Sequence, residues 1–140
     1  MGNRQKAILR FLDRRLIKGY LEDFSPSDDL VTLEDESSRR VTVNIAELKG
    51  IFFVKTFTGN RHHREKKSFR GARSGKRVFV RFKDGESMMG HIDGDVPWAK
   101  GFFLESMKSN GFFLMPVDHE SNNIKVFVVA AAVADVATIG

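Results

Sequence analysis

The residues with the clearest chemical potential are the basic side chains of residues 61–77, RHHREKKSFRGARSGKR. This stretch contains eight of the 23 Lys and Arg residues and one of the 18 Asp and Glu residues, so its net charge is +7. The rest of the chain, with 15 basic and 17 acidic residues, has a net charge of −2. Clusters of Lys and Arg bind polyanions because they release counterions condensed on the phosphates. The stretch is therefore either a phosphate-binding arm or a solvated connector.

The candidate phosphate-binding residues are the cations of this stretch and two arginines at matching places on either side of it: Arg61, Arg64, Lys66, Lys67, Arg70, Arg73, Lys76, Arg77, Arg10 and Arg81.

Other chemically suggestive residues lack the partners that their chemistry needs. His62 and His63 have no acidic neighbours at metal-ligand spacing. Asp93 and Asp95 form a turn without the remaining ligands of a calcium loop. Trp98 follows Pro97 in a polar turn and is a candidate interaction anchor, or else part of a lid over one end of the fold. Since no P-loop, nucleophile elbow or dinucleotide fingerprint is present, we expect no cofactor, no metal and no enzymatic activity.

Composition narrows the class of protein. A chain of 140 residues forms one compact unit or two very small ones, and 41% hydrophobic residues with 13 Phe can build a core. No Cys is present, which excludes disulfides and thiolate metal sites. The apolar run before Arg10 is shorter than a signal sequence requires, and no later run reaches membrane-spanning length. We expect a cytoplasmic protein without a membrane partner.

The elements that must position these residues repeat within the chain. Residues 7–21, AILRFLDRRLIKGYL, match residues 78–92, VFVRFKDGESMMGHI, at an offset of 71. Each copy predicts a strand, a turn at Asp13-Arg14 or Asp84-Gly85, and a second strand. Asp-Gly is typical of a two-residue type I′ hairpin, which needs positive φ at both positions. Glycine inside a strand, as at Gly19 and Gly90, indicates a bulge or sharp bend.

Both copies continue with further short strands. In the first copy these are residues 30–33, 41–45 and 50–55, and in the second they are residues 101–104, 111–115 and 124–129. The alanine-rich end, residues 130–139, is predicted as a one-turn bend and a short strand, because Val133 and Val136 take the places of Leu48 and Ile51. About ten strands predict an all-β fold.

The order of strand, Asp turn, glycine-containing strand, two strands and a short final strand resembles the Sm-like small barrel, including the bacterial Hfq proteins. The resemblance implies two Sm-like (SH3-like) five-stranded barrels in tandem. We expect residues 4–58 to form the first barrel and residues 76–139 the second, with a hairpin insertion. Residues 59–75 are expected to form the basic linker between them. The segments 18–26 and 47–55 also resemble an uncharacterised bacterial domain family, some members of which occur beside PilZ domains.

Sm and Hfq proteins bind RNA in rings of barrels, so the resemblance implies nucleic-acid binding. The Tyr-Lys-His run of Hfq corresponds to Val43-Asn44-Ile45 here, and the Arg-Gly pair of Sm proteins is absent, so no defined RNA pocket is implied. We expect a non-catalytic binding or adaptor protein. Its partner is RNA or another polyanion, or alternatively an acidic protein, and a degenerate PilZ-type cyclic di-GMP binder is less favoured. Edge strands 50–55 and 135–139 would allow a homo-oligomer.

Overall fold

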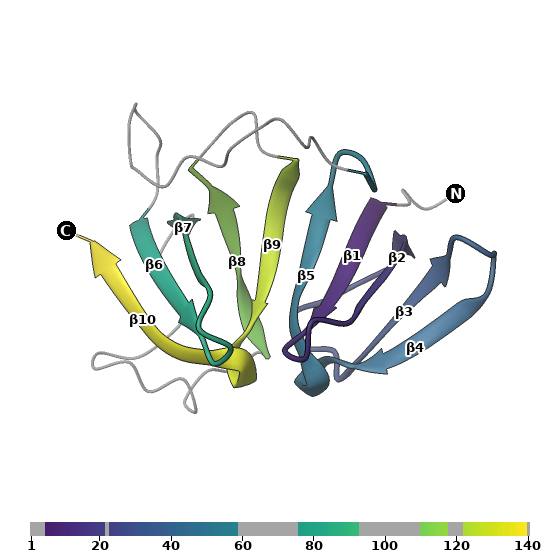
Figure 1. Ribbon diagram of the computed structural model, residues 1–140, viewed down its shortest axis with the longest axis horizontal. Coiled ribbons are helices and arrows are strands. Elements are labelled where there is room, and N and C mark those ends of the chain that lie inside the picture. The colour runs from purple at the N-terminus through teal and green to yellow at the C-terminus, as the bar shows by residue number, and fades with distance from the viewer. Residues whose placement is uncertain (1–4, 22, 59–75, 93–109, 118–121, 140) are drawn as a thin grey trace.

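A computed structural model describes residues 5–21, 23–58, 76–92, 110–117 and 122–139. These residues form ten strands and two short 3₁₀ turns, so the expected all-β class is confirmed (Figure 1). The strands of the N-terminal half are β1 (Gln5–Phe11), β2 (Leu16–Leu21), β3 (Leu30–Asp35), β4 (Arg40–Asn44) and β5 (Leu48–Val54). Those of the C-terminal half are β6 (Lys76–Phe82), β7 (Ser87–Ile92), β8 (Gly111–Pro116), β9 (Asn123–Val129) and β10 (Val133–Ile139).

All ten strands belong to one antiparallel sheet in the order β10-β6-β7-β8-β9-β5-β1-β2-β3-β4. The order within each half is the same: the fifth strand of the half comes first, followed by its first, second, third and fourth strands. β1 and β6, like β2 and β7, have equal lengths and lie 71 residues apart, as the sequence repeat predicted. The sheet ends at β10 and β4, so it is not closed among the described strands.

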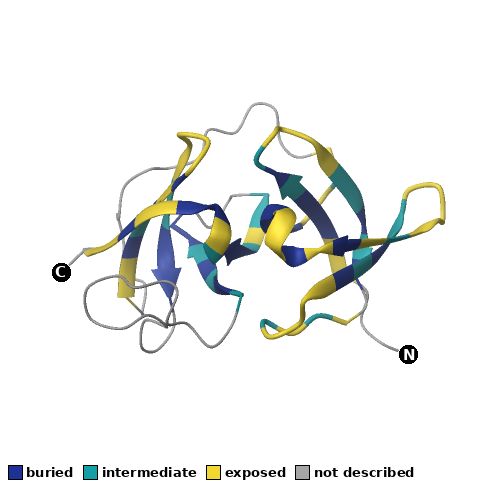
Figure 2. Cartoon of the chain, turned by 90° about the horizontal axis from the view of Figure 1, so that it is seen from below, coloured by how far each residue is buried: buried dark blue, intermediate teal, exposed yellow. Residues whose placement is uncertain are grey.

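The two halves are joined through the pairing of β5 with β9, in which Ile51 lies opposite Phe127 and Phe52 opposite Val126. All seven residues of β5 are buried. Its side chains alternate between two cores: Ile51 and Phe53 pack in the core of the first half, and Phe52 and Val54 pack in the core of the second. Phe127 and Val129 of β9 pack in the first core in the same way, so each core includes residues from the other half. Figure 2 shows buried residues in the interior of both halves.

The last strand of each half follows a single 3₁₀ turn, as the sequence predicted. These turns are Ile45–Glu47 and Ala130–Ala132, and they contact each other where the two halves meet, at the bottom of Figure 1. The alanine-rich end therefore forms a turn and a strand rather than a helix. Val133 begins β10 as Leu48 begins β5, and both side chains are buried.

The prediction of two-residue type I′ hairpins is wrong. Between β1 and β2 the Phe11 N–H donates to the Arg15 carbonyl at 3.0 Å, which leaves a three-residue loop, and φ is positive only at its last residue, Arg14. The loop between β6 and β7 is built alike, with φ of 92° at Gly85. A three-residue loop that ends in a left-handed residue is a common alternative hairpin. Asp84 selects it because its carboxylate accepts the Glu86 N–H.

Gly19 and Gly90 do not form bulges, because β2 and β7 are paired in continuous register on both sides of them. Glycine is required because the neighbouring strand lies too close for a side chain. A Cβ on Gly19 would lie 2.4 Å from the Glu34 carbonyl oxygen, and one on Gly90 would lie 2.4 Å from that of Met115. The strand predictions were right at both places, and the predicted bulge was wrong.

Several sequence predictions lie outside the described residues. These are the basic linker 59–75, the hairpin insertion with its strand 101–104, and Trp98. In the part of the chain that the structure describes, no helix is long and apolar enough to cross a membrane.

Candidate functional site

A cleft of about 460 Å³ lies between the β1–β2 hairpin of the first half and the β6–β7 hairpin of the second. Its lining contains four basic and two acidic side chains with one phenylalanine: Arg10, Phe11, Arg14, Arg15, Lys49, Asp84 and Glu86. A hollow of about 250 Å³ shares Arg10, Lys49 and Glu86 with it and extends past Phe52 and Met88 to Asn123. The two hollows are named the junction groove, since both lie where the halves meet.

The strand and hairpin geometry places the arginines in the junction groove. Arg10 occupies the face of β1 opposite to that of the buried Leu9 and Phe11, and its guanidinium lies 5.1 Å from the centre of the Phe52 ring. Arg14 occupies the left-handed position of the loop, and Arg15 follows it with its guanidinium 4.4 Å from the Phe11 ring centre. The attraction of a cation to an aromatic ring helps to hold each of these guanidinium groups in place.

Only one of these arginines has an acidic partner among the described residues. Arg15 forms an ion pair with Asp13, with its Nε 2.7 Å from Oδ2. Hydrogen bonds from the Arg15 backbone N–H and side chain lower the pKa of Asp13 below its usual value. Arg10 and Arg14 have no carboxylate within ion-pair distance in the described parts of the chain, so their charges are available for an anion.

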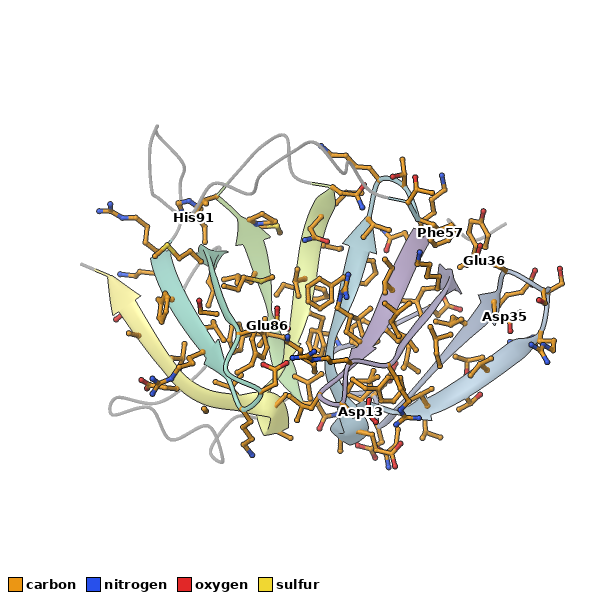
Figure 3. The ribbon with its side chains drawn as sticks, viewed as in Figure 1. Asp13, Asp35, Glu36, Phe57, Glu86 and His91 are labelled. Atoms are coloured by element: carbon orange, nitrogen blue, oxygen red, sulfur yellow. The ribbon has the colours of Figure 1, made fainter. Side chains whose placement is uncertain are left out.

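Lys49 is neutralised by the second half. Its side chain is 6% exposed, and its Nζ donates to Asp84 at 2.8 Å and to Glu86 at 2.5 Å. It also lies 4.8 Å from the centre of the Phe82 ring. Burial alone would raise the pKa of Asp84, but the hydrogen bonds from Lys49 and from the Glu86 backbone N–H together lower it. Glu86 projects from the β7 side toward the first half (Figure 3). The Lys49 cluster therefore fixes the walls of the junction groove.

The structure places the predicted phosphate-binding residues in different regions. Arg10 lines the junction groove. Arg81 is not among its lining residues and lies 3.8 Å from Asp135 of β10. Lys76 and Arg77 are exposed at the start of β6, where the basic stretch enters the sheet. Arg61, Arg64, Lys66, Lys67, Arg70 and Arg73, with His62 and His63, lie outside the described residues. The described cations are thus not brought into one site.

Sequence reasoning missed Arg14, Arg15 and Lys49. The Arg14-Arg15 pair next to a predicted hairpin turn was a usable signal, because both residues must project from the end of a two-stranded ribbon. Lys49 offered no such signal, since its partners are 35 and 37 residues away in the other half. Within the described ranges, no group of three His, Cys, Asp or Glu residues is arranged to hold a metal ion.

Comparison with known proteins places the chain in a wider group without assigning an activity. A family model described as "Family of unknown function (DUF6982)" matches residues 3–140. No curated protein and no solved structure matches the chain.

Proposed function

The chain belongs to the family of unknown function DUF6982, and we propose that it is a non-catalytic protein that binds single-stranded nucleic acid along the junction groove and the basic stretch 61–77. The observation that carries this proposal is the convergence of Arg10, Arg14 and Arg15 on one cleft between the halves. Guanidinium groups bind phosphate with paired N–H donors, and phosphate contacts supply most of the sequence-independent affinity of such proteins.

Thr56, which precedes the basic stretch in sequence, lies close to one end of the same groove. Asn123 lines that end of the groove. The backbone N–H and the hydroxyl of Thr56 both donate to the side-chain oxygen of Asn122, the residue before Asn123, at 3.1 Å. Thr56 precedes the stretch by a few residues in sequence. Residues 61–77, with a net charge of +7, follow this point in the sequence, and we propose that their cations add to the phosphate binding of the arginines.

We also propose that each half is an Sm-like barrel, as the sequence pattern implied. The repeated order of fifth, first, second, third and fourth strand supports this proposal, as do the short 3₁₀ turns before the last strands. In this chain the two barrels share one sheet through β5 and β9, so the junction groove lies between two hairpins at equivalent places in the two halves.

Binding of a 5′-labelled single-stranded RNA dodecamer of uridine, measured by fluorescence anisotropy at increasing salt, tests the function. We expect log Kd to rise linearly with log salt. The variant Arg10→Gln, Arg14→Gln should bind more weakly, and its slope should fall by about 1.4 because each lost contact removes roughly 0.7. The matched control Arg39→Gln, Lys83→Gln removes the same charge from exposed positions outside the groove and should keep the slope.

A second variant separates the basic stretch from the groove. Replacing Arg61, Arg64, Lys66 and Lys67 by Ser should flatten the slope further and weaken all sequences about equally, since phosphate contacts position a ligand without specifying it. The sheet should remain folded in this variant. Absence of binding at low salt by the unchanged protein would overturn the proposed function and favour the acidic-protein partner. Equal slopes for the groove variant and its control would exclude the groove.

A further inference from the structure

A separate hollow of about 250 Å³ lies on the outer face of β2, β3 and β4. It is lined by one aromatic, two aliphatic, three charged and one hydroxyl side chain: Tyr20, Asp23, Leu30, Thr32, Leu33, Glu34 and Arg40. Leu30 is 56% exposed, so an apolar side chain borders the hollow. This combination of an aromatic ring, an exposed aliphatic side chain and polar groups is suited to a flat heterocycle.

The register of the sheet places the polar groups of the hollow in one row. Tyr20 lies opposite Glu34, and Glu34 lies opposite Arg40. Directly opposite residues project from the same face with Cβ atoms about 5 Å apart. The neighbouring residues Gly19 and Leu33 are buried, and Leu33 both lines the hollow and packs in the core of the first half. The Tyr20 and Phe57 rings pack in a T-shaped pair with 5.4 Å between their centres. Phe57 lies beyond the end of β5 (Figure 3).

This row fits one nucleobase best. An aromatic ring offers a stacking face to any base. A carboxylate accepts two adjacent N–H donors, and a guanidinium donates to carbonyl oxygens and ring nitrogens. Guanine is the base whose pairing edge offers two adjacent N–H donors beside a carbonyl oxygen. The carboxylates of Asp23 and Glu34 disfavour a phosphate in the same place. We propose that this hollow binds a guanine base of the single-stranded nucleic acid held by the junction groove, a proposal that rests on the proposed function.

The junction groove and the hollow are connected along one face of the sheet. Arg10 lies opposite Leu16 at the groove, and Tyr20 is four residues further along β2. At about 3.4 Å per residue, this separation is roughly 14 Å. Lys18 lies between them on the same face as Tyr20, opposite Ile8. A single-stranded RNA whose phosphates lie at Arg10 would therefore pass Lys18 before one of its bases reaches Tyr20.

The test compares two labelled RNA octamers by anisotropy, one of eight uridines and one in which a single guanine replaces a uridine. We expect the guanine-containing octamer to bind about tenfold more tightly, which is within the discrimination that a bidentate base contact provides. Glu34→Gln should bring the ratio of the two Kd values close to one. The control Glu36→Gln removes the same charge from an exposed position outside the hollow and should keep the ratio. Tyr20→Phe keeps the stacking ring and should also keep it.

The outcomes separate this proposal from the proposed function. If neither octamer binds, the proposed function is wrong. If both octamers bind equally to the unchanged protein, phosphate binding is correct but the guanine site is not. A guanine preference that survives in Glu34→Gln would place base recognition elsewhere. Titration with guanosine, which carries no phosphate, followed by the NMR signals of Tyr20 and Thr32 gives a readout independent of the arginines, and unchanged signals would overturn the site.

Discussion

At the residue scale, Gly19 and Gly90 are required by the close approach of the adjacent strand and not by an unusual φ. A Cβ at either position would lie 2.4 Å from a carbonyl oxygen of that strand, and backbone cannot move aside as a flexible side chain can. We expect Gly19→Ala and Gly90→Ala each to lower the free energy of unfolding by about 1–3 kcal/mol, as for other overpacked sites. Urea unfolding followed by circular dichroism measures the loss.

A third glycine supplies the control for this experiment. A Cβ on Gly85 would have nothing within 4 Å, but the residue has φ of 92°. Asn tolerates positive φ better than other side chains, so Gly85→Asn should cost less than Gly19→Ala. If Gly19→Ala were as stable as the unchanged protein, the strands would be further apart than described.

The Lys49 cluster predicts a pH-dependent contribution to stability. The pKa of Asp84 is lower in the folded chain than its usual value of 3.8. The ion pair of Asp84 therefore stabilises the fold fully at pH values above the pKa of Asp84 in the unfolded chain. This contribution is lost as the pH falls through the lower pKa that Asp84 has in the folded chain. We expect Asp84→Asn to lower the free energy of unfolding by about 1–3 kcal/mol at pH 7, because the Lys49 ammonium loses a charged acceptor.

Urea unfolding at a series of pH values measures this difference between Asp84→Asn and the unchanged protein. The difference should be constant from pH 7 to about 5 and should shrink below pH 4. Asp13 and Asp35, whose pKa values are also lowered, remain in both proteins and cancel in the comparison. A difference that did not change with pH would show that the substitution acts through packing.

At the scale of elements, local patterns predicted most of the strands but not their junction. The matching segments 7–21 and 78–92 predicted β1, β2, β6 and β7, and their 71-residue offset linked the two halves. The hairpin loops were wrong by one residue, because the Asp side chain caps the turn and stabilises a longer loop than the Asp-Gly pair suggests. The pairing of β5 with β9 has no local signal, since it joins residues about 70 to 80 positions apart.

The candidate site follows the same division. Arg10 was predicted from the repeat, whereas the groove around it depends on the junction of β5 with β9 and on Lys49. Tyr20 was visible in the sequence as the one tyrosine, but its partners Glu34 and Arg40 become neighbours only through the register of β2, β3 and β4. Local sequence therefore identified single residues, and long-range pairing determined which of them share a site.

The two-sided burial of β5 predicts that the first half does not fold alone. Without the second half, Phe52 and Val54 would lose their core, and Phe24 would lose its ring contacts with Phe113 and Phe127. Backbone bonds across the halves, such as that from the Asn110 N–H to the Pro26 carbonyl, would also be lost. We expect a fragment of residues 1–58 to show poorly dispersed NMR spectra and no cooperative unfolding. A stable, cooperative fragment would show that the halves are independent domains.

At the scale of the whole molecule, the two ends of the sheet differ from the junction although the strands are equivalent. β4 takes the place in the first half that β9 takes in the second, and β10 takes the place of β5. The buried Phe127 of β9 corresponds to the exposed Thr42 of β4. The buried Phe52 and Phe53 of β5 correspond to the exposed Ala137 and Thr138 of β10. Polar and small residues at an edge strand oppose further pairing.

The ion pairs of the junction are missing from the ends as well. Lys49, which binds the β6–β7 hairpin, corresponds to Ala134 in β10, and the hairpin that a second copy would meet there carries Arg14 and Arg15 in place of Gly85 and Glu86. Pairing of β10 with β4 of another copy would therefore lack both the aromatic packing and the charge pairs of β5 with β9. This difference favours a monomer, in which the two halves complete each other, over the homo-oligomer that the edge strands would allow.

We therefore expect a monomer of 15.9 kDa by size-exclusion chromatography with light scattering, at concentrations from micromolar to about millimolar. The reverse substitution tests the reason. Thr42→Phe combined with Ala137→Phe and Thr138→Phe restores the aromatic residues of the junction at both ends, and this variant should associate as its concentration rises, because β10 of one copy can then pack on β4 of the next. A control with Phe at Lys83, an exposed position outside both edges, should stay monomeric. A multiple of 15.9 kDa for the unchanged protein would show instead that the polar edges pair, and the sheet would then continue from one chain into the next.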